Sequence, residues 1–259
     1  MTFTNRTILI TGGNSGIGLA LAEALQSKGN RLIITGRNRD SLQAVLQRNP
    51  EMAGYRLDVT NENSLAAFSD AVIAEHPELD TVILNAGIME AEDYTAERVK
   101  LDVAERTITT NLTAPIRLAA ALLPHLRTQP HAALLTVSSG LAFVPKAANP
   151  VYSATKAAIH AWTQAVRHQL RDTSVDVHEI APPLVATELT PGQSAVAAAM
   201  PLQEFIDEVV EILALNEVPD EILVARVKFL RKAEAEGRYD KTFSTVNSLD
   251  MKRRAAQIR

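Results

Sequence analysis

The sequence predicts a single three-layer α/β domain with a doubly wound parallel sheet, and two observations carry this prediction. Short apolar runs such as residues 132–137 alternate with helical stretches, a pattern typical of strands buried on both faces of a parallel sheet. The apolar run 6–11 is followed at once by a glycine-rich turn and by helical periodicity from Ile17 to Lys28. The length of 259 residues suits one α/β unit with one large core.

The same periodicities assign the remaining elements. Further strands are expected over residues 31–35, 54–57, 81–84, 132–137 and 175–180. Helices are expected over residues 40–48 and 64–75, on either side of Asn111, and over 118–126, 152–170 and about 205–213. The stretch 118–126 is apolar around much of its circumference, so its helix must be covered on more than one face.

Composition excludes several function classes. The net charge of −4 argues against a nucleic-acid partner, which would need a concentrated basic face. The chain has no cysteine, so disulfides, thiolate catalysis and sulfur-bound zinc are excluded. The six histidines show no metal-ligand spacing, and we expect no metal site.

The location of the protein is expected to be cytoplasmic, without a membrane partner. No apolar run approaches the ~18 residues that a membrane span needs. The glycine-rich motif begins by residue 11, which leaves no room for a signal peptide before it.

The stretch around Tyr152 and Lys156 contains the strongest candidate for chemistry. Four residues apart on a helix, the two side chains face the same way, and a nearby ammonium favours ionisation of a phenol. We therefore expect Lys156 to lower the pKa of Tyr152 and make it a usable acid or base. Taken alone this spacing is common on surface helices, but Ser138 and Ser139 stand upstream at the carboxyl end of a predicted strand, where ligands bind in such sheets.

The glycine-rich turn after the first strand is a candidate phosphate-binding loop. Its glycines let the backbone approach a pyrophosphate, and the following helix offers unpaired N–H groups at its positive end. A structural turn without a ligand is the competing interpretation. The residues that we assign to binding are Gly12, Asn14, Ser15, Gly16, Ile17 and Gly18.

Three further short motifs lie in the same part of the chain: Asp58 with Val59, then Asn85, Ala86 and Gly87, and then Asn111. Together with the motifs above, they follow one another in the order of the short-chain dehydrogenase/reductase family. The sequence resembles this family over roughly residues 5–190, and its overall pattern looks most like the DltE-like branch of oxidoreductases. The resemblance implies a Rossmann-like fold and a nicotinamide cofactor. It also implies a small-molecule carbonyl or alcohol substrate.

By this resemblance, further residues are expected to contact the cofactor. Asp58 would meet the adenine and Val59 would supply adjacent backbone, although a helix cap at Asp58 or Thr60 is the competing explanation. Ala86 and Gly87, beside Asn85, would pass beneath the adenosine ribose. The family usually has Pro-Gly near the nicotinamide where this chain has two prolines, so contacts there are assigned to Pro182, Val185 and Thr187.

The end of the second strand bears on the choice of cofactor. An acid in this place binds the adenosine ribose hydroxyls and repels a 2′-phosphate, whereas an arginine accommodates that phosphate. Gly36 occupies the place of the acid and Arg37 follows it. We expect a preference for NADP(H), with NAD(H) open as an alternative. The competing interpretation makes Arg37 and Arg39 solvated loop cations.

The expected function is an NADP(H)-dependent oxidoreductase that interconverts a carbonyl and a secondary alcohol by hydride transfer. Tyr152 would be the general acid and base, Lys156 would also bind the nicotinamide ribose, Ser139 would hold the reacting oxygen, and Asn111 would hold a water in the proton relay. A nucleotide-binding regulatory protein on the same fold is the alternative. A serine hydrolase is disfavoured because Ser139 lacks the G-x-S-x-G context.

The last third of the chain is expected to shape the substrate pocket. The resemblance places a mobile substrate lid at about residues 188–215. Pro191, Gly192 and Pro201 are helix-breaking residues, so we do not expect its first half to form one rigid helix. Residues 219–259 read as a divergent C-terminal extension of the same domain. A homodimer or homotetramer is expected, because stretches 118–126 and 157–170 read as too apolar to face water.

Overall fold

A computed structural model describes residues 3–99 and 101–257 of the chain, with side chains described up to residue 248. Within these residues, seven strands form one sheet in the order β3-β2-β1-β4-β5-β6-β7, and all the neighbouring strands pair in parallel. The strands are β1 Thr7–Ile10, β2 Arg31–Gly36, β3 Ala53–Arg56, β4 Thr81–Leu84, β5 Ala132–Val137, β6 Val175–Ile180 and β7 Glu221–Ile222. The three-layer α/β prediction is confirmed, and the short edge strand β7 is an addition to it.

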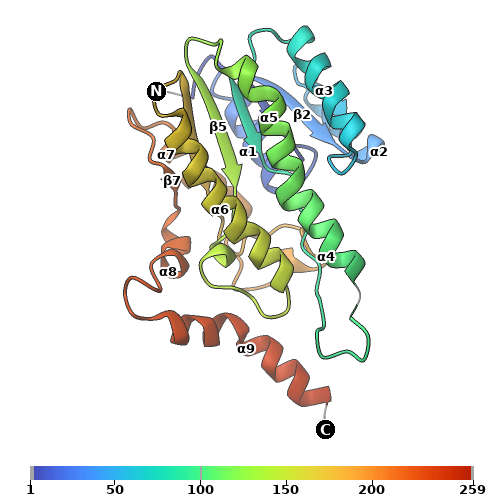
Figure 1. The fold of residues 1–259 in the computed structure, drawn as a ribbon, viewed down its shortest axis with the longest axis vertical. Helices are drawn as coiled ribbons and strands as arrows, with labels where there is room; N and C mark the ends of the chain where they lie inside the picture. Colours follow the sequence, from blue (N-terminus) through green and yellow to red (C-terminus); the bar gives the residue numbers. More distant parts are fainter. Residues whose placement is uncertain (1–2, 100, 258–259) are drawn as a thin grey trace.

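Helices cover both faces of the sheet, and α9 lies apart from these layers, at the lower end of the molecule in Figure 1. The α-helices are α1 Gly16–Gln26, α2 Arg39–Arg48, α3 Glu62–Glu75, α4 Leu101–Ile108, α5 Ala114–Leu126, α6 Pro150–Leu170, α7 Leu202–Leu213, α8 Lys228–Arg231 and α9 Tyr239–Gln257. A π-helical turn, Thr109–Thr113, joins α4 to α5, and short 3₁₀ turns lie at Gly140–Ala142, Gln193–Ala195 and Ala225–Val227. Among the described residues, no helix combines the length and the apolar character needed to cross a lipid bilayer.

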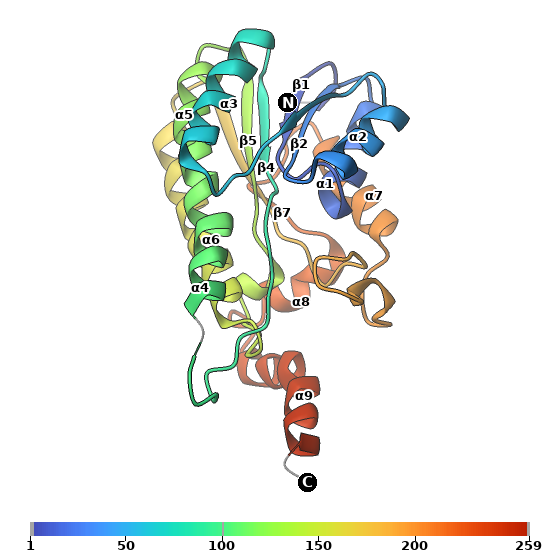
Figure 2. The same ribbon diagram turned by 90° about the vertical axis from the view of Figure 1, so that its right-hand side faces the viewer.

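Each face of the sheet is covered by its own hydrophobic cluster. Helices α1, α2 and α7 cover one face, and α3, α5 and α6 cover the other, as Figure 2 shows edge-on. Because successive residues of a strand point to opposite faces, Ile8 and Ile10 enter the first cluster while Leu9 enters the second. Burial on both faces explains why the central strands read as continuous apolar runs.

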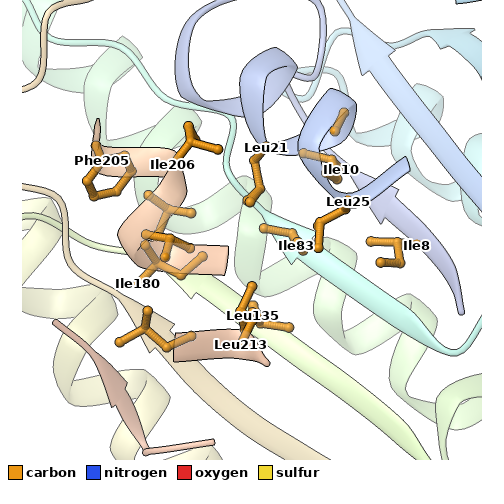
Figure 3. Packing of buried hydrophobic residues seen from close by; sticks show 14 of the residues in the cluster. Ile8, Ile10, Leu21, Leu25, Ile83, Leu135, Ile180, Phe205, Ile206 and Leu213 are labelled. Carbon is orange, nitrogen blue, oxygen red and sulfur yellow. The ribbon is translucent and has the colours of Figure 1, made fainter. Parts of the chain in front are cut away.

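Helix α7 belongs to the core. Its residues Phe205, Ile206 and Leu213 are buried against α1 and the sheet, as Figure 3 shows. Residues 202–213 therefore cover one sheet face, whereas the sequence suggested an apolar face that docks when a lid closes. A mobile lid, if residues 188–215 contain one, is confined by this packing to about residues 188–200.

The core role of α7 predicts the effect of two leucine truncations. Leu213 is 1% exposed and Leu215, just after the helix, is 49% exposed. We expect Leu213→Ala to lower the free energy of unfolding by about 2–5 kcal/mol, because it leaves a cavity in the core. Leu215→Ala, the matched control, should change it by less than about 0.5 kcal/mol. Urea unfolding checks this, and equal small effects would mean that α7 is not a core helix.

Candidate active site

The candidate site is a cavity of about 440 Å³ at the carboxyl-terminal edge of the sheet. Strands β1, β4, β5 and β6 end at this edge, and the loops that follow them form the walls. Of the residues assigned from the sequence, those lining the cavity are Gly12, Asn14, Ser15, Gly16, Ile17, Gly18, Arg37, Asp58, Val59, Asn85, Ala86, Gly87, Ser139, Tyr152, Lys156, Pro182, Val185 and Thr187. Asn111 is the one assigned residue that does not line the cavity.

The turn between β1 and α1 is shaped by glycine. Gly12 and Gly16 have φ of +65° and +53°, a backbone conformation that side chains disfavour. A Cβ at Gly18 would lie 2.3 Å from the Gly12 carbonyl oxygen, so only glycine lets the helix approach the turn this closely. The Ser15 side chain makes no capping hydrogen bond to α1. The first N–H groups of the helix therefore have no partner within it, and they border the cavity.

Asn85 braces this turn from the neighbouring strand. Its side-chain amide donates to the carbonyl oxygens of Thr11 at 2.9 Å and Gly12 at 3.2 Å. The Thr11 hydroxyl in turn accepts hydrogen bonds from the backbone N–H groups of Asn85 and Ala86. Thr11 was not singled out from the sequence, although it begins the glycine-rich motif. Because the Asn85 amide is engaged by backbone, its side chain shapes the cavity wall.

Gly36 lies beside Asn14, and this contact limits what position 36 can hold. A Cβ at Gly36 would be 2.6 Å from the Asn14 side-chain Cγ. Asn14 cannot move away freely, because its amide donates to the Ser41 hydroxyl at 2.7 Å. An acidic side chain at position 36 would therefore displace the turn. Arg37 is exposed at the rim of the cavity.

Asp58 closes the cavity at the end of β3. Its carboxylate accepts hydrogen bonds from the hydroxyl of Thr60 at 2.7 Å and from the backbone N–H of Thr60 at 3.0 Å. The hydroxyl contact is the main reason why the pKa of Asp58 is lowered, and Arg37 adds to this effect. Helix α3 is capped by Asn61, whose side chain accepts from Ser64. Asp58 is thus a turn-forming residue, and it does not cap a helix.

Tyr152 lies on α6 and is 6% exposed. Burial raises its pKa to about 12, and a hydrogen bond with the Ser139 side chain opposes this rise. Lys156 lies over the face of the Tyr152 ring, with its Nζ 5.6 Å from the ring centroid. The expectation that Lys156 lowers the pKa of Tyr152 is not met in this arrangement, because burial raises this pKa and the opposing effect comes from Ser139.

Lys156 is buried as deeply as Tyr152, at 4% exposed. Its ammonium donates to the carbonyl oxygen of Val137, the last residue of β5, at 2.8 Å. Burial lowers its pKa to about 8, and the negative charge of Glu179 opposes that shift. Lys156 therefore ties α6 to the strand that leads into Ser139.

Asn111 holds the segment that follows β4. In the π-helical turn, its side-chain oxygen accepts from the Ile88 N–H at 2.9 Å and its amide donates to the Ile88 carbonyl at 2.8 Å. A Cβ at Gly87 would lie 3.3 Å from the Asn111 oxygen and 3.6 Å from the Lys156 Nζ. Asn111 therefore lies next to Lys156, with its side chain engaged by backbone.

The segment after β6 forms the remaining wall. The Pro182 carbonyl accepts from the Gly140 N–H at 2.8 Å, which links this segment to the loop after Ser139. Buried Gln193 donates to the Val185 carbonyl at 2.9 Å and to the Thr187 hydroxyl at 3.3 Å. Gln193 lines the cavity but was missed, because nothing in a loop sequence marks an inward-pointing glutamine.

A group of charged side chains beneath the site was also missed from the sequence. Ligand-type atoms of His160, Glu179 and Glu221 lie within 4.8 Å of one another. Arg231 donates to both carboxylate oxygens of Glu221, at 2.6 and 2.9 Å. Because residues 160, 179 and 221 are far apart in the chain, histidine spacing could not indicate this group.

Comparison with known proteins gives consistent matches. The model of the family described as short chain dehydrogenase matches residues 6–196. A protein of Bacillus subtilis (strain 168), described as the uncharacterized oxidoreductase DltE, is 40% identical over 252 residues, which cover 96% of this chain and 99% of that protein. An uncharacterized oxidoreductase of Staphylococcus epidermidis is 32% identical over 191 residues, 72% of this chain and 81% of its own.

Solved structures share the fold at low identity. A short-chain dehydrogenase of Burkholderia cenocepacia in complex with NADP has a TM-score of 0.80 and 23% identity, covering 95% of this chain and 98% of its own. A short-chain dehydrogenase/reductase of Burkholderia phymatum in complex with NAD has a TM-score of 0.78 and 20% identity, covering 91% of this chain and 95% of its own. The match to the family model and the DltE relative establish that the chain belongs to the short-chain dehydrogenase/reductase family of oxidoreductases, in its DltE-like branch.

Proposed function

We propose that this protein is an NADP(H)-dependent oxidoreductase that interconverts a carbonyl and a secondary alcohol. The observation that carries the proposal is the meeting of Ser139, Tyr152 and Lys156 in the same cavity as the glycine-rich turn. A dinucleotide that places its phosphates at the start of α1 would bring its nicotinamide toward these three side chains. Family membership supports this reading.

The turn and its surroundings fit a dinucleotide. Positive φ at Gly12 and Gly16, and the absence of any Cβ at Gly18, leave backbone N–H groups at the cavity wall. When bound, the cofactor supplies the hydride, and the protein supplies position and electrostatics. Lys156 would hold the nicotinamide ribose, and Pro182, Val185 and Thr187 would border the nicotinamide.

The proton chemistry would rest on Tyr152. The phenol carries its proton at neutral pH and lies where it can donate it to a carbonyl oxygen, although burial, which raises its pKa to about 12, makes it a weaker acid than a free phenol. Ser139, which hydrogen-bonds Tyr152, would position the same oxygen. Oxidation needs the reverse transfer, in which the ionised phenol of Tyr152 would accept the proton of the alcohol.

The preference for NADP(H) is supported by two neighbouring positions. An acid cannot be placed at Gly36 without displacing Asn14, so the group that would repel a 2′-phosphate is sterically excluded. Arg37, exposed at the rim of the cavity, is available to bind that phosphate. One related structure holds NADP and another holds NAD.

The first experiment is a spectrophotometric screen of NADPH oxidation against a panel of carbonyl compounds. From the segment 184–200, the cavity is lined by Val185, Thr187, Glu188, Leu189 and Gln193, and the Glu188 carboxylate disfavours anionic substrates. Turnover of at least one uncharged ketone or aldehyde is expected. Tight NADPH binding without turnover of any compound would favour the regulatory alternative.

Tyr152→Phe should lower turnover by at least about 10²-fold, because only the transferable proton is lost. The dissociation constant of NADPH, measured by fluorescence, should stay within about twofold of wild type, because the ring and its burial are kept. Near-normal turnover in this variant would remove Tyr152 from the chemistry.

Arg37→Ala should weaken NADPH binding by the ~1.5–3 kcal/mol of a charge-assisted hydrogen bond and leave NADH binding nearly unchanged. Arg39→Ala is the matched control, because Arg39 is equally exposed but does not line the cavity. Titration of each cofactor into each variant measures this. Equal losses for both cofactors in Arg37→Ala would show that Arg37 does not read the 2′-phosphate.

A homo-oligomer and a cytoplasmic location remain predictions. Leu118, Leu122 and Leu126 are buried within the chain, so a subunit interface would use other residues. Leu101 and Ile108 of α4 are 59% and 42% exposed and offer such a surface. Light scattering during size-exclusion chromatography should give a dimer or tetramer, and a particle of 28.1 kDa would contradict this expectation.

A further inference from the structure

Glu179 is a fully buried carboxylate that the proposed chemistry does not use. It lies in β6, is 0% exposed, and its Oε1 has no hydrogen-bond partner among the described residues. Its Oε2 lies 2.7 Å from the Nδ1 of His160. A carboxylate without full hydrogen bonding is costly to bury, so its retention requires a nearby positive charge.

The sheet register and the helix periodicity place Glu179 close to Lys156. Thr136 of β5 pairs with Glu179, and the next pair in register is Val137 with Ile180. Lys156 donates to the Val137 carbonyl, one residue further along the same strands. On α6, His160 follows Lys156 by four residues and so shares its helix face, the face that contacts Glu179.

The other charges of this group are already paired. Glu221 of β7 stands in register beside Glu179, and Arg231 of α8 engages both of its carboxylate oxygens. The Arg231 guanidinium also lies 4.8 Å from the Phe143 ring centroid. His160 contacts Glu179 and the charge of Arg231 also acts on it, but Lys156, at 4% exposed, is the most deeply buried cation of the group.

We propose that Glu179 is a positioning residue for Lys156: the buried carboxylate of Glu179 keeps the Lys156 ammonium charged and in its place over the Tyr152 ring. This inference rests on the proposed function in one respect, the role of Lys156 in holding the nicotinamide ribose. Burial by itself favours the neutral amine, and the Glu179 charge opposes this. The same pairing explains how a carboxylate with one unpartnered oxygen persists in the core.

The expected pH dependence follows from the groups around Lys156. They are Tyr152 and His160 on α6, Glu179 on β6, Glu221 on β7 and Arg231 on α8. With a pKa of about 8, Lys156 loses its charge as the pH rises through 8. Without the Glu179 charge this loss should occur at lower pH, because desolvation is then unopposed.

A direct test is an NMR titration of the Lys156 side chain in protein labelled with ¹³C-lysine. The Lys156 resonance is assigned by its loss in Lys156→Met. We expect Glu179→Gln to move the titration midpoint to lower pH. Glu221→Gln, the matched control, should leave it nearly unchanged, because Glu221 is paired with Arg231. An unchanged midpoint in Glu179→Gln would overturn the proposal, whether or not the protein is active.

A second readout is NADPH affinity as a function of pH. If the midpoint falls by about one unit, Glu179→Gln should bind NADPH roughly five- to tenfold more weakly than wild type at pH 8.5 but within about twofold at pH 6, where Lys156 is charged in both. A loss of equal size at both pH values would indicate a merely structural role for Glu179 and overturn the proposal. Failure of wild-type protein to bind NADPH would instead refute the proposed function and leave the NMR test standing.

Thermal unfolding covers the case in which Glu179→Gln does not fold. If the two buried charges compensate each other, the double variant Lys156→Met, Glu179→Gln should unfold at a higher temperature than either single variant. A double variant no more stable than the worse single variant would contradict the pairing.

Discussion

The structure depends on the need to bury both faces of a parallel sheet. Parallel strands are joined by crossovers, so helices cover each face, and all the strands end at the same edge. This arrangement brings together Gly12, Asn85, Ser139 and Pro182, which are spread over 170 residues of sequence but border one cavity. The location of the site is therefore a consequence of how the sheet is covered.

Hydrogen bonds from side chains to backbone give that cavity its shape. Asn85 holds the glycine-rich turn, Asn111 holds the segment at Ile88, and Lys156 holds the end of β5. Each of these bonds satisfies a backbone group that a loop at the sheet edge would otherwise leave unpaired. The residues that support the candidate chemistry thus also carry the local structure, so substitutions at Asn111 and Lys156 will mix the two effects.

The C-terminal segment supports the wall of the site from outside. A Cβ at Gly140, directly after Ser139, would lie 2.4 Å from the Leu230 side chain, so α8 packs closely on this loop. Further along, Asn247 of α9 accepts from the Ala147 N–H at 2.6 Å and donates to the Pro145 carbonyl at 3.2 Å. Residues 225–248 thereby support the loop that leads to Tyr152, and in Figure 1 this segment lies beneath α6. The segment beyond residue 196, where the match to the family model ends, is thus structurally connected to the candidate active site.

The sequence by itself determined the sheet, its helices and the order of the motifs, because these depend on local periodicity, on glycine conformation and on spacing within one helix, as for Tyr152 and Lys156. Tertiary structure decided what depends on burial and on residues far apart in the chain. It gave α7 a place in the core, engaged Asn111 with Ile88, and brought Glu179 into contact with His160. Tertiary structure also decided the direction of the Tyr152 pKa shift. The spacing of Tyr152 and Lys156 indicates that the two groups are neighbours. Only the packed structure determines how completely water is removed from the phenol, and this burial raises its pKa.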